Sequence, residues 1–147
     1  MHATEQRKAA EQFNNIQTMA SLFSRIVAGE LPCHKVAEND MFLAFMDIQP
    51  LALGHVLVVP KMEVDRFFDL PEEVLAAFNP FAQKVAQKIE RAVPCRRVGV
   101  AVIGLEVPHA HMHLLPLQTV ADINFERPKL EVSSEDLAEM ADRIRQA

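Results

Sequence analysis

The stretch Val107-Pro108-His109-Ala110-His111-Met112-His113-Leu114-Leu115-Pro116 places three of the chain's six histidines within five residues. Side chains of a β-strand alternate between its two faces, so this spacing predicts a strand with all three imidazoles on one face and apolar side chains on the other. Imidazole has an unperturbed pKa of about 6.5 and can act near neutral pH as a nucleophile, acid, base or metal ligand. The stretch therefore predicts a strand that packs one face into a core and carries a reactive site on the other.

The segments around this strand predict an α+β fold, in which helices cover one antiparallel sheet of about five strands. Proline and glycine positions, turn pairs and apolar periodicity place the element boundaries; among these signals are the turn pair Asn39-Asp40 between two strands and Ser133 as a capping residue for the last helix. Ser21 is a candidate N-cap and Gly29 a candidate stop for the first helix, and Pro80 is expected to kink or split the long one. The expected elements are a helix at 21–28, strands at 34–38, 41–48 and 55–59, a helix at 71–92, strands at 97–103 and 108–115, and a helix at about 134–145.

Composition limits the class of protein. The chain has 147 residues and a formal net charge of −5, which excludes a broad basic surface for nucleic acid. It lacks both a signal-peptide pattern and the run of about 20 apolar residues that a membrane helix needs, so we expect a cytoplasmic protein without a membrane partner. We expect residues 1–18 to form a polar extension that is partly helical or partly disordered. Residues 19–147 are expected to form one domain with its core in 19–120. Cys33 and Cys95 lie far apart, which indicates neither a disulfide framework nor a thiol-rich zinc site.

From the residues alone, three interpretations of the histidine cluster stay open. The histidines could be structural and only hydrogen-bonded. They could hold a metal with help from His55, Asp47 or Glu106, although same-face residues of a strand have Cα atoms about 6.6–7 Å apart and three of them on one ion would strain it. They could catalyse phosphoryl chemistry, in which the central imidazole attacks phosphorus and its neighbours hold the phosphate oxygens.

At these residues the chain resembles the histidine triad (HIT) family of nucleotide hydrolases and transferases, in its Hint-like branch. Residues 109–115 match the signature His-φ-His-φ-His-φ-φ, where φ is apolar. The resemblance extends, in the family's order, to three further segments, which are Leu22–Pro32, Ala44–Pro50 and Gly54–Pro60. It implies a HIT-like fold with a long helix between two groups of strands, and a homodimer that forms a continuous sheet.

The resemblance also implies a role for each candidate site residue. His111 would attack the α-phosphate and become a covalent nucleotidyl-histidine, while His109 and His113 would contact phosphate oxygens and assist the leaving group. His55 would support them from a neighbouring strand, and Asp47 would accept hydrogen bonds from the ribose hydroxyls. The implied apolar walls around the nucleobase are Leu22, Phe23, Ile26, Phe45, Met46, Ile48 and Leu57. The implied substrate is a conjugate of a purine nucleoside monophosphate, cleaved without metal or cofactor.

Two departures from the Hint-like pattern qualify these implications. The usual Asn and Gly-Gln-[Ser/Thr] features ahead of the triad are missing; only Gly104 is in place, and Glu106 falls where a hydroxyl residue is expected. A carboxylate there should repel phosphate, so substrate and leaving group can differ from those of well-known members. A non-catalytic purine nucleotide-binding module is therefore the main alternative, ahead of a His-ligated metal hydrolase. Ser21 and Ser24 replace a Cys-x-x-Cys pair, so we expect no structural zinc.

Overall fold

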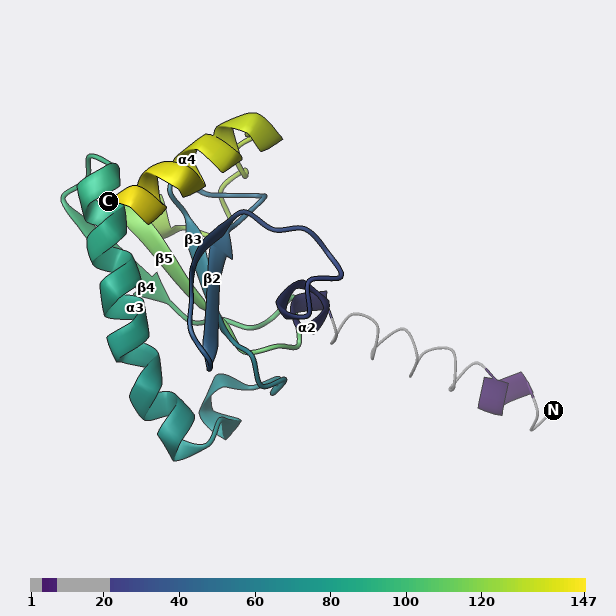
Figure 1. Ribbon diagram of the computed structural model, residues 1–147. Coiled ribbons are helices and arrows are strands. Elements are labelled where there is room, and N and C mark those ends of the chain that lie inside the picture. Colours follow the sequence, from purple (N-terminus) through teal and green to yellow (C-terminus); the bar gives the residue numbers. More distant parts are fainter. Residues whose placement is uncertain (1–3, 8–21) are drawn as a thin grey trace.

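A five-stranded antiparallel sheet with strand order β1-β2-β3-β5-β4 forms the centre of the structure, a computed structural model that describes residues 4–7 and 22–147 (Figure 1). This confirms the predicted α+β class. The strands are β1 (Lys35–Glu38), β2 (Phe42–Met46), β3 (Val56–Pro60), β4 (Arg97–Ala101) and β5 (Met112–Leu117). The helices are α2 (Leu22–Val27), η1 (Phe67–Asp69), α3 (Glu72–Ala92), η2 (Val120–Ile123) and α4 (Ser134–Gln146). Ser21 and most of the expected extension 1–18 lie outside the described residues.

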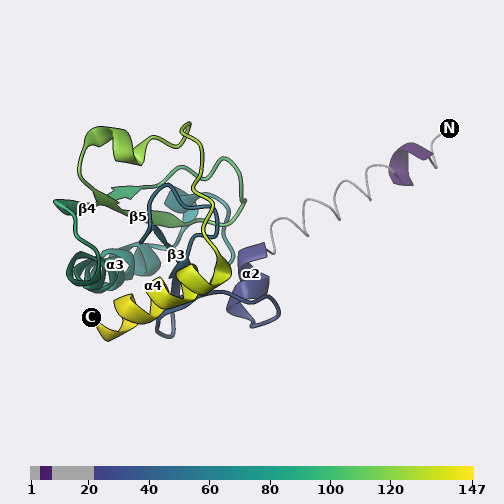
Figure 2. The same ribbon diagram turned by 90° about the horizontal axis from the view of Figure 1, so that it is seen from above.

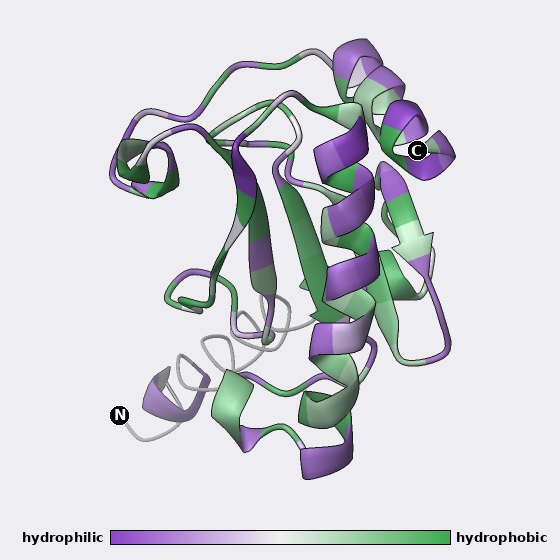
Figure 3. Cartoon of the chain, turned by 90° about the vertical axis from the view of Figure 1, so that its left-hand side faces the viewer, coloured by the Kyte–Doolittle hydropathy of each residue, from purple (hydrophilic) through white to green (hydrophobic). Residues whose placement is uncertain are grey.

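Helices α3 and α4 cover one face of the sheet, whereas η2 and the segment after β5 lie on the other side (Figure 2). The hydropathy colouring shows α3 hydrophilic on its outer side, as an amphipathic helix requires (Figure 3). Ser133 caps α4 by accepting a hydrogen bond from the backbone N–H of Asp136 at 3.1 Å, which confirms the predicted start. The main core lies between these helices and the sheet, where alternate residues of β2, β3 and β5 are buried.

Helix α3 is not split at Pro80, contrary to one of the two outcomes expected from the sequence. It runs without interruption through its 21 residues. Proline leaves the carbonyl four residues earlier, that of Ala76, without its helical partner. Both Pro80 and Ala76 are exposed, so water can satisfy that carbonyl and the helix continues.

Glycine ends the short helix α2, as predicted. Gly29 has a φ of 80°, in the left-handed region that glycine adopts easily. The N–H of Glu30 bonds to the carbonyl of Arg25 at 2.9 Å, and the N–H of Gly29 to that of Ile26 at 3.0 Å, which is the Schellman arrangement. The chain thereby turns back toward β1. Phe23 of the helix packs in the second, smaller core, which lies on the face of the sheet that α3 and α4 leave uncovered, called the open face below.

The triad strand is shorter than the sequence predicts. Strand β5 begins at Met112, so His113 lies in the strand while His109 and His111 precede it. The backbone explains the difference, because the N–H of Ala110 bonds to the carbonyl of Val64 at 2.7 Å, in the segment after β3, instead of joining the sheet ladder. The prediction of one regular strand presenting all three imidazoles on the same face was therefore wrong.

The turn between β1 and β2 forms as predicted. The Asn39 side-chain oxygen accepts hydrogen bonds from the N–H groups of Met41 and Phe42, at 2.9 and 2.8 Å. Cys33 and Cys95 are both free. Among residues 4–7 and 22–147, no helix combines the length and apolar character needed to cross a membrane.

Candidate functional site

The open face of the sheet carries a cavity of about 230 Å³ beside the triad. His111 and His113 line it together with residues from three other segments: the loop after β2, the loop after β4 and the segment after η2. The lining residues are Asp47, Gln49, Ile103, Gly104, Leu105, Glu106, His111, His113, Phe125, Glu126 and Lys129. This cavity is the candidate active site.

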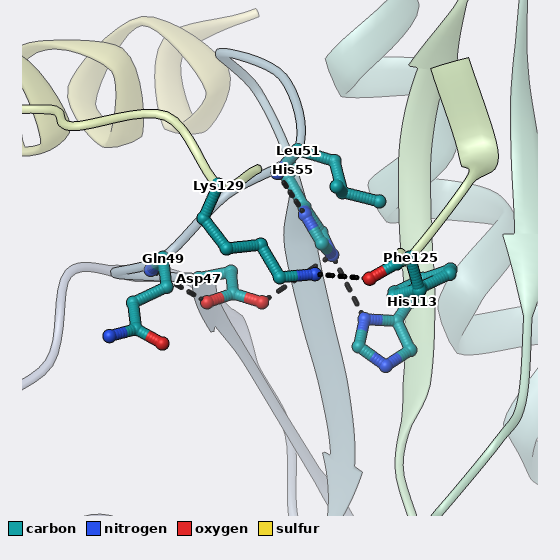
Figure 4. A network of polar contacts seen from close by, with 7 residues as sticks. All are labelled: Asp47, Gln49, Leu51, His55, His113, Phe125 and Lys129. Atoms are coloured by element: carbon teal, nitrogen blue, oxygen red, sulfur yellow. Dashed lines mark hydrogen bonds and ion pairs between the residues drawn. The ribbon is translucent and has the colours of Figure 1, made fainter. Parts of the chain in front are cut away.

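A chain of hydrogen bonds fixes the protonated nitrogens of His55 and His113 (Figure 4). The backbone N–H of Leu51 donates to His55 Nδ1 at 3.0 Å, so Nδ1 carries no proton and Nε2 does. His55 Nε2 lies 2.9 Å from His113 Nδ1 and donates to it. His113 in turn must carry its proton on Nε2, which leaves that N–H available to a ligand.

Burial keeps both imidazoles neutral. Removal from water disfavours the charged form and lowers the pKa of His55 to about 3, with smaller contributions from His113 and Lys129. The same cause lowers the pKa of His113 to about 4, with smaller contributions from His111 and Lys129. At neutral pH these two side chains supply hydrogen bonds but no positive charge.

His111 has its proton on the other ring nitrogen from His113. Its Nδ1 donates to the backbone carbonyl of His109 at 2.7 Å, so Nε2 carries the lone pair. Its ring lies 5.0 Å from that of His113 and 5.2 Å from that of Phe23, measured between centroids. A neutral imidazole oriented by an N–H···O=C bond is the form that a nucleophilic histidine needs.

The structure does not bring the His109 imidazole to the cavity. His109 is fully buried, and its Nε2 donates to the carbonyl of Pro60 at 2.8 Å. Its Nδ1 has no hydrogen-bond partner within the described part of the chain, and burial lowers its pKa. The expectation that His109 contacts a phosphate oxygen is thus corrected: its side chain is engaged elsewhere, and its backbone carbonyl positions His111.

Asp47 follows β2 and lies beside His55. Its Oδ1 accepts the N–H of Gln49 at 2.9 Å, and its Oδ2 lies 3.5 Å from His55 Nε2. Burial raises the pKa of its carboxyl group. Because His55 is neutral, this contact is a polar one between neighbours and not an ion pair.

The predicted nucleobase walls divide into three groups. Four of the residues pack together on the open face beside the triad; they are Phe23, Ile26, Phe45 and Leu57. Met46 faces the opposite core, because it follows Phe45 directly in β2 and side chains alternate, so its assignment to the site was wrong. Leu22 and Ile48 are 39% and 70% exposed and belong to neither core cluster.

Phe125 and Lys129 are site residues that the sequence reasoning missed. The Phe125 ring packs edge-on to His113, with centroids 4.6 Å apart. The Lys129 ammonium lies 5.0 Å from the centre of that ring and 3.4 Å from the Phe125 carbonyl oxygen. Both come from an irregular segment without apolar periodicity, so no pattern in the sequence points to them.

Three potential metal donors lie close together, one each from Asp47, His55 and His113, all within 4.8 Å of one another. Coordination requires a lone pair on each nitrogen. His55 Nε2 carries a proton, so it has no lone pair for a metal, and the lone pair of His113 Nδ1 accepts that same proton. The Leu51 N–H fixes this arrangement, because it occupies the lone pair of His55 Nδ1 and keeps the proton on Nε2. The cluster therefore does not fit a metal ion.

With the fold and the geometry of the triad established, the family can be assigned: the chain belongs to the HIT family, whose HIT domain profile matches residues 28–120. An adenosine 5'-monophosphoramidase of Schizosaccharomyces pombe is 36% identical over 100 residues, covering 67% of this chain and 74% of that protein. An uncharacterized HIT-like protein of Helicobacter pylori is 36% identical over 98 residues, covering 65% and 94%. The crystal structure of a HIT-like protein from Bartonella henselae superimposes with a TM-score of 0.74 at 29% identity, covering 85% and 94%.

Proposed function

We propose that this chain cleaves the α-phosphate of a purine nucleoside monophosphate conjugate through a covalent nucleotidyl-histidine on His111. One observation carries the proposal: the His111 Nδ1–H is held by the His109 carbonyl, which leaves the Nε2 lone pair free beside the N–H of His113. The relationship to an adenosine 5'-monophosphoramidase supports the substrate class.

The proposed reaction has two displacement steps. His111 Nε2 forms a bond to the α-phosphorus as the bond from phosphorus to the leaving atom breaks, and the leaving group departs with the electrons of that bond and takes up one proton from solvent. Water then cleaves the phosphorus–nitrogen bond and returns one proton, so the cycle consumes a single water. The His113 Nε2–H hydrogen-bonds the departing atom or a phosphate oxygen.

The nucleoside would lie across the open face of the sheet. Asp47 has two oxygens that can accept from a ribose diol, and it lies at the end of β2 next to the cavity. The apolar side chains of Phe45 and Leu57 lie on the same face and suit the flat surface of a purine. The proposal assigns binding of the base and ribose to this side and the chemistry to His111.

A homodimer through β4 belongs to the same proposal. Strand β4 is at the edge of the sheet, where its backbone is open to pairing on one side. Apolar side chains on this strand and just after it are exposed: Val100 by 55%, Val102 by 40%, Ile103 by 44% and Leu105 by 88%. Two copies pairing along β4 would bury these side chains and join the two sheets. Sedimentation of the purified protein should give the mass of a dimer, and a monomer at micromolar concentration would contradict it.

Turnover of adenosine 5'-phosphoramidate tests the proposed activity. The wild type should release AMP, and His111→Ala should lower the rate by about 1,000-fold or more, as loss of a covalent nucleophile does. His34→Ala is the matched control, because His34 lies next to Ser134, away from the cavity. A wild type that binds AMP but turns over no conjugate would instead favour a non-catalytic nucleotide-binding module.

A further inference from the structure

Among the residues that the structure describes, one permanently cationic side chain lines the cavity beside the triad. Its lining contains three carboxylates, those of Asp47, Glu106 and Glu126, and a single ammonium group, that of Lys129. Its two histidines include His113, which burial keeps neutral. A nucleotide phosphate is anionic and gains charge on the reacting oxygens during displacement, so a cation is needed to offset repulsion by these carboxylates.

Lys129 belongs to the segment 118–130, which is held in place by hydrogen bonds between its own side chains and backbone groups. The Asp122 carboxylate accepts the N–H groups of Gln118 and Thr119, both at 2.8 Å, and the Arg127 guanidinium donates to the Ala121 carbonyl at 2.8 Å. At the other end, the Leu130 N–H donates to the carbonyl of Pro50 at 2.8 Å, which ties the segment to the loop after β2. The backbone of Lys129 is therefore fixed opposite Asp47 and the triad.

The Lys129 side chain extends from this segment over the site (Figure 4). Within residues 4–7 and 22–147 its ammonium makes one long hydrogen bond, 3.4 Å to the Phe125 carbonyl, and it lies near the Phe125 ring. An ammonium has three N–H donors, and these contacts occupy at most one of them. Its charge reaches three of the groups around it: burial is the main cause of the lowered pKa values of His55 and His113, to which Lys129 adds, and Lys129 opposes the burial that raises the pKa of Asp47.

We propose that Lys129 is the residue that binds the phosphate group of the nucleotide at this site, by an ammonium–phosphate hydrogen bond. The inference rests on the proposed function and deepens it, because it assigns phosphate recognition to a residue outside the triad and its supporting loop. The four-carbon stem lets the ammonium move from the Phe125 carbonyl to a phosphate oxygen without rearrangement of the segment. Lys129 supplies the positive charge that the neutral imidazoles of His55 and His113 lack.

Binding of AMP and of adenosine, measured by calorimetry, tests this assignment. Lys129→Met keeps the apolar stem over Phe125 and removes the charge. It should weaken AMP binding by at least about tenfold, the size expected for a hydrogen bond to a charged group, while adenosine affinity stays within about twofold. Lys129→Arg should retain most of the wild-type affinity for AMP. Lys84 is a similarly exposed lysine on α3, and Lys84→Met should change the affinity for neither ligand.

The results separate this inference from the proposed function. Equal affinity of the wild type and Lys129→Met for AMP, or an equal loss for AMP and adenosine, would overturn the role of Lys129 while leaving the chemistry of His111 intact. A wild type that binds neither ligand would overturn both. A wild type that binds AMP in a Lys129-dependent way, without turnover of any conjugate, would support Lys129 and reject the proposed reaction.

Discussion

Acidification should unfold this protein earlier than its composition alone suggests, because His55, His109 and His113 are buried and burial lowers the pKa of each. His55 and His113 titrate normally near 6.5 when exposed, but burial lowers their pKa values to about 3 and about 4 in the native state. Between these limits the unfolded chain binds more protons than the folded one, so stability is complete above pH 6.5 and falls as the pH falls toward 4.

The size of the effect follows from the two shifts. Each histidine that stays neutral when folded costs about 1.4 kcal/mol per pH unit below 6.5, or about 2 kcal/mol by pH 5. Together His55 and His113 should remove about 4 kcal/mol between pH 7.5 and pH 5, a large part of the total stability of a typical domain. The raised pKa of Asp47 acts in the opposite direction and offsets a part of this loss.

Urea unfolding followed by circular dichroism at several pH values measures this dependence directly. Near pH 5.5 His55 and His113 together should lower the free energy of unfolding by about 2.7 kcal/mol per pH unit, which corresponds to two protons, and the lowered pKa of His109 adds to this slope. In His55→Gln the slope should fall by about one proton relative to the wild type, whatever the absolute stability of the variant. A wild-type slope below about half a proton would refute the claim that both imidazoles are neutral and buried.

Three further predictions concern the surroundings of the triad. Glu106→Gln removes an exposed negative charge that lines the cavity and repels the phosphate, so it should lower KM for an adenylyl conjugate by about two- to fivefold. Glu139→Gln on α4 is the control, and an unchanged or higher KM for Glu106→Gln would contradict the repulsion. Gly99→Ala would place a Cβ 2.3 Å from Leu117 Cδ1 and 3.1 Å from its Cγ, and should destabilise the protein by about 1–2 kcal/mol in thermal unfolding, an effect that Leu117→Ala in the same chain should reduce. Turnover should be insensitive to EDTA, since the Asp47–His55–His113 cluster does not fit a metal; loss of activity restored by zinc would show otherwise.

Much of the architecture could be predicted because local signals coincide with element boundaries. The turn at Asn39, the stop at Gly29 and the cap at Ser133 each use a side chain or backbone property that acts over a few residues. The apolar strands follow from their composition in the same way. These signals sufficed for the order and type of the elements, although they do not determine which strands become neighbours.

The errors arise where a longer-range contact overrides a local pattern. The spacing of His109 suits a strand, but the hydrogen bond from Ala110 to Val64 holds this part of the chain outside the sheet. Pro80 would interrupt a buried helix and is accommodated on an exposed face. Met46 is a different case, because strand alternation alone would have separated it from Phe45.

Phe125 and Lys129 could not be found from the sequence at all. Their positions depend on the hydrogen bond between Leu130 and Pro50, which joins segments about 80 residues apart. By contrast, Asp47 follows β2, His55 directly precedes β3 and His113 lies on β5, and the pairing of these strands brings the three side chains together. The regular part of the site was thus predictable in outline, and its irregular wall was not.

The most direct test of the central claim is the mass of the protein during turnover. The wild type, mixed with adenosine 5'-phosphoramidate and quenched in base, should gain the mass of one adenylyl group, and peptide mapping should place it on His111. Base is required, because acid cleaves a phosphoramidate. His111→Ala should show no adduct. A wild type that releases AMP without any trapped adduct on rapid quenching, or one modified at another residue, would contradict the assignment of His111 as the nucleophile.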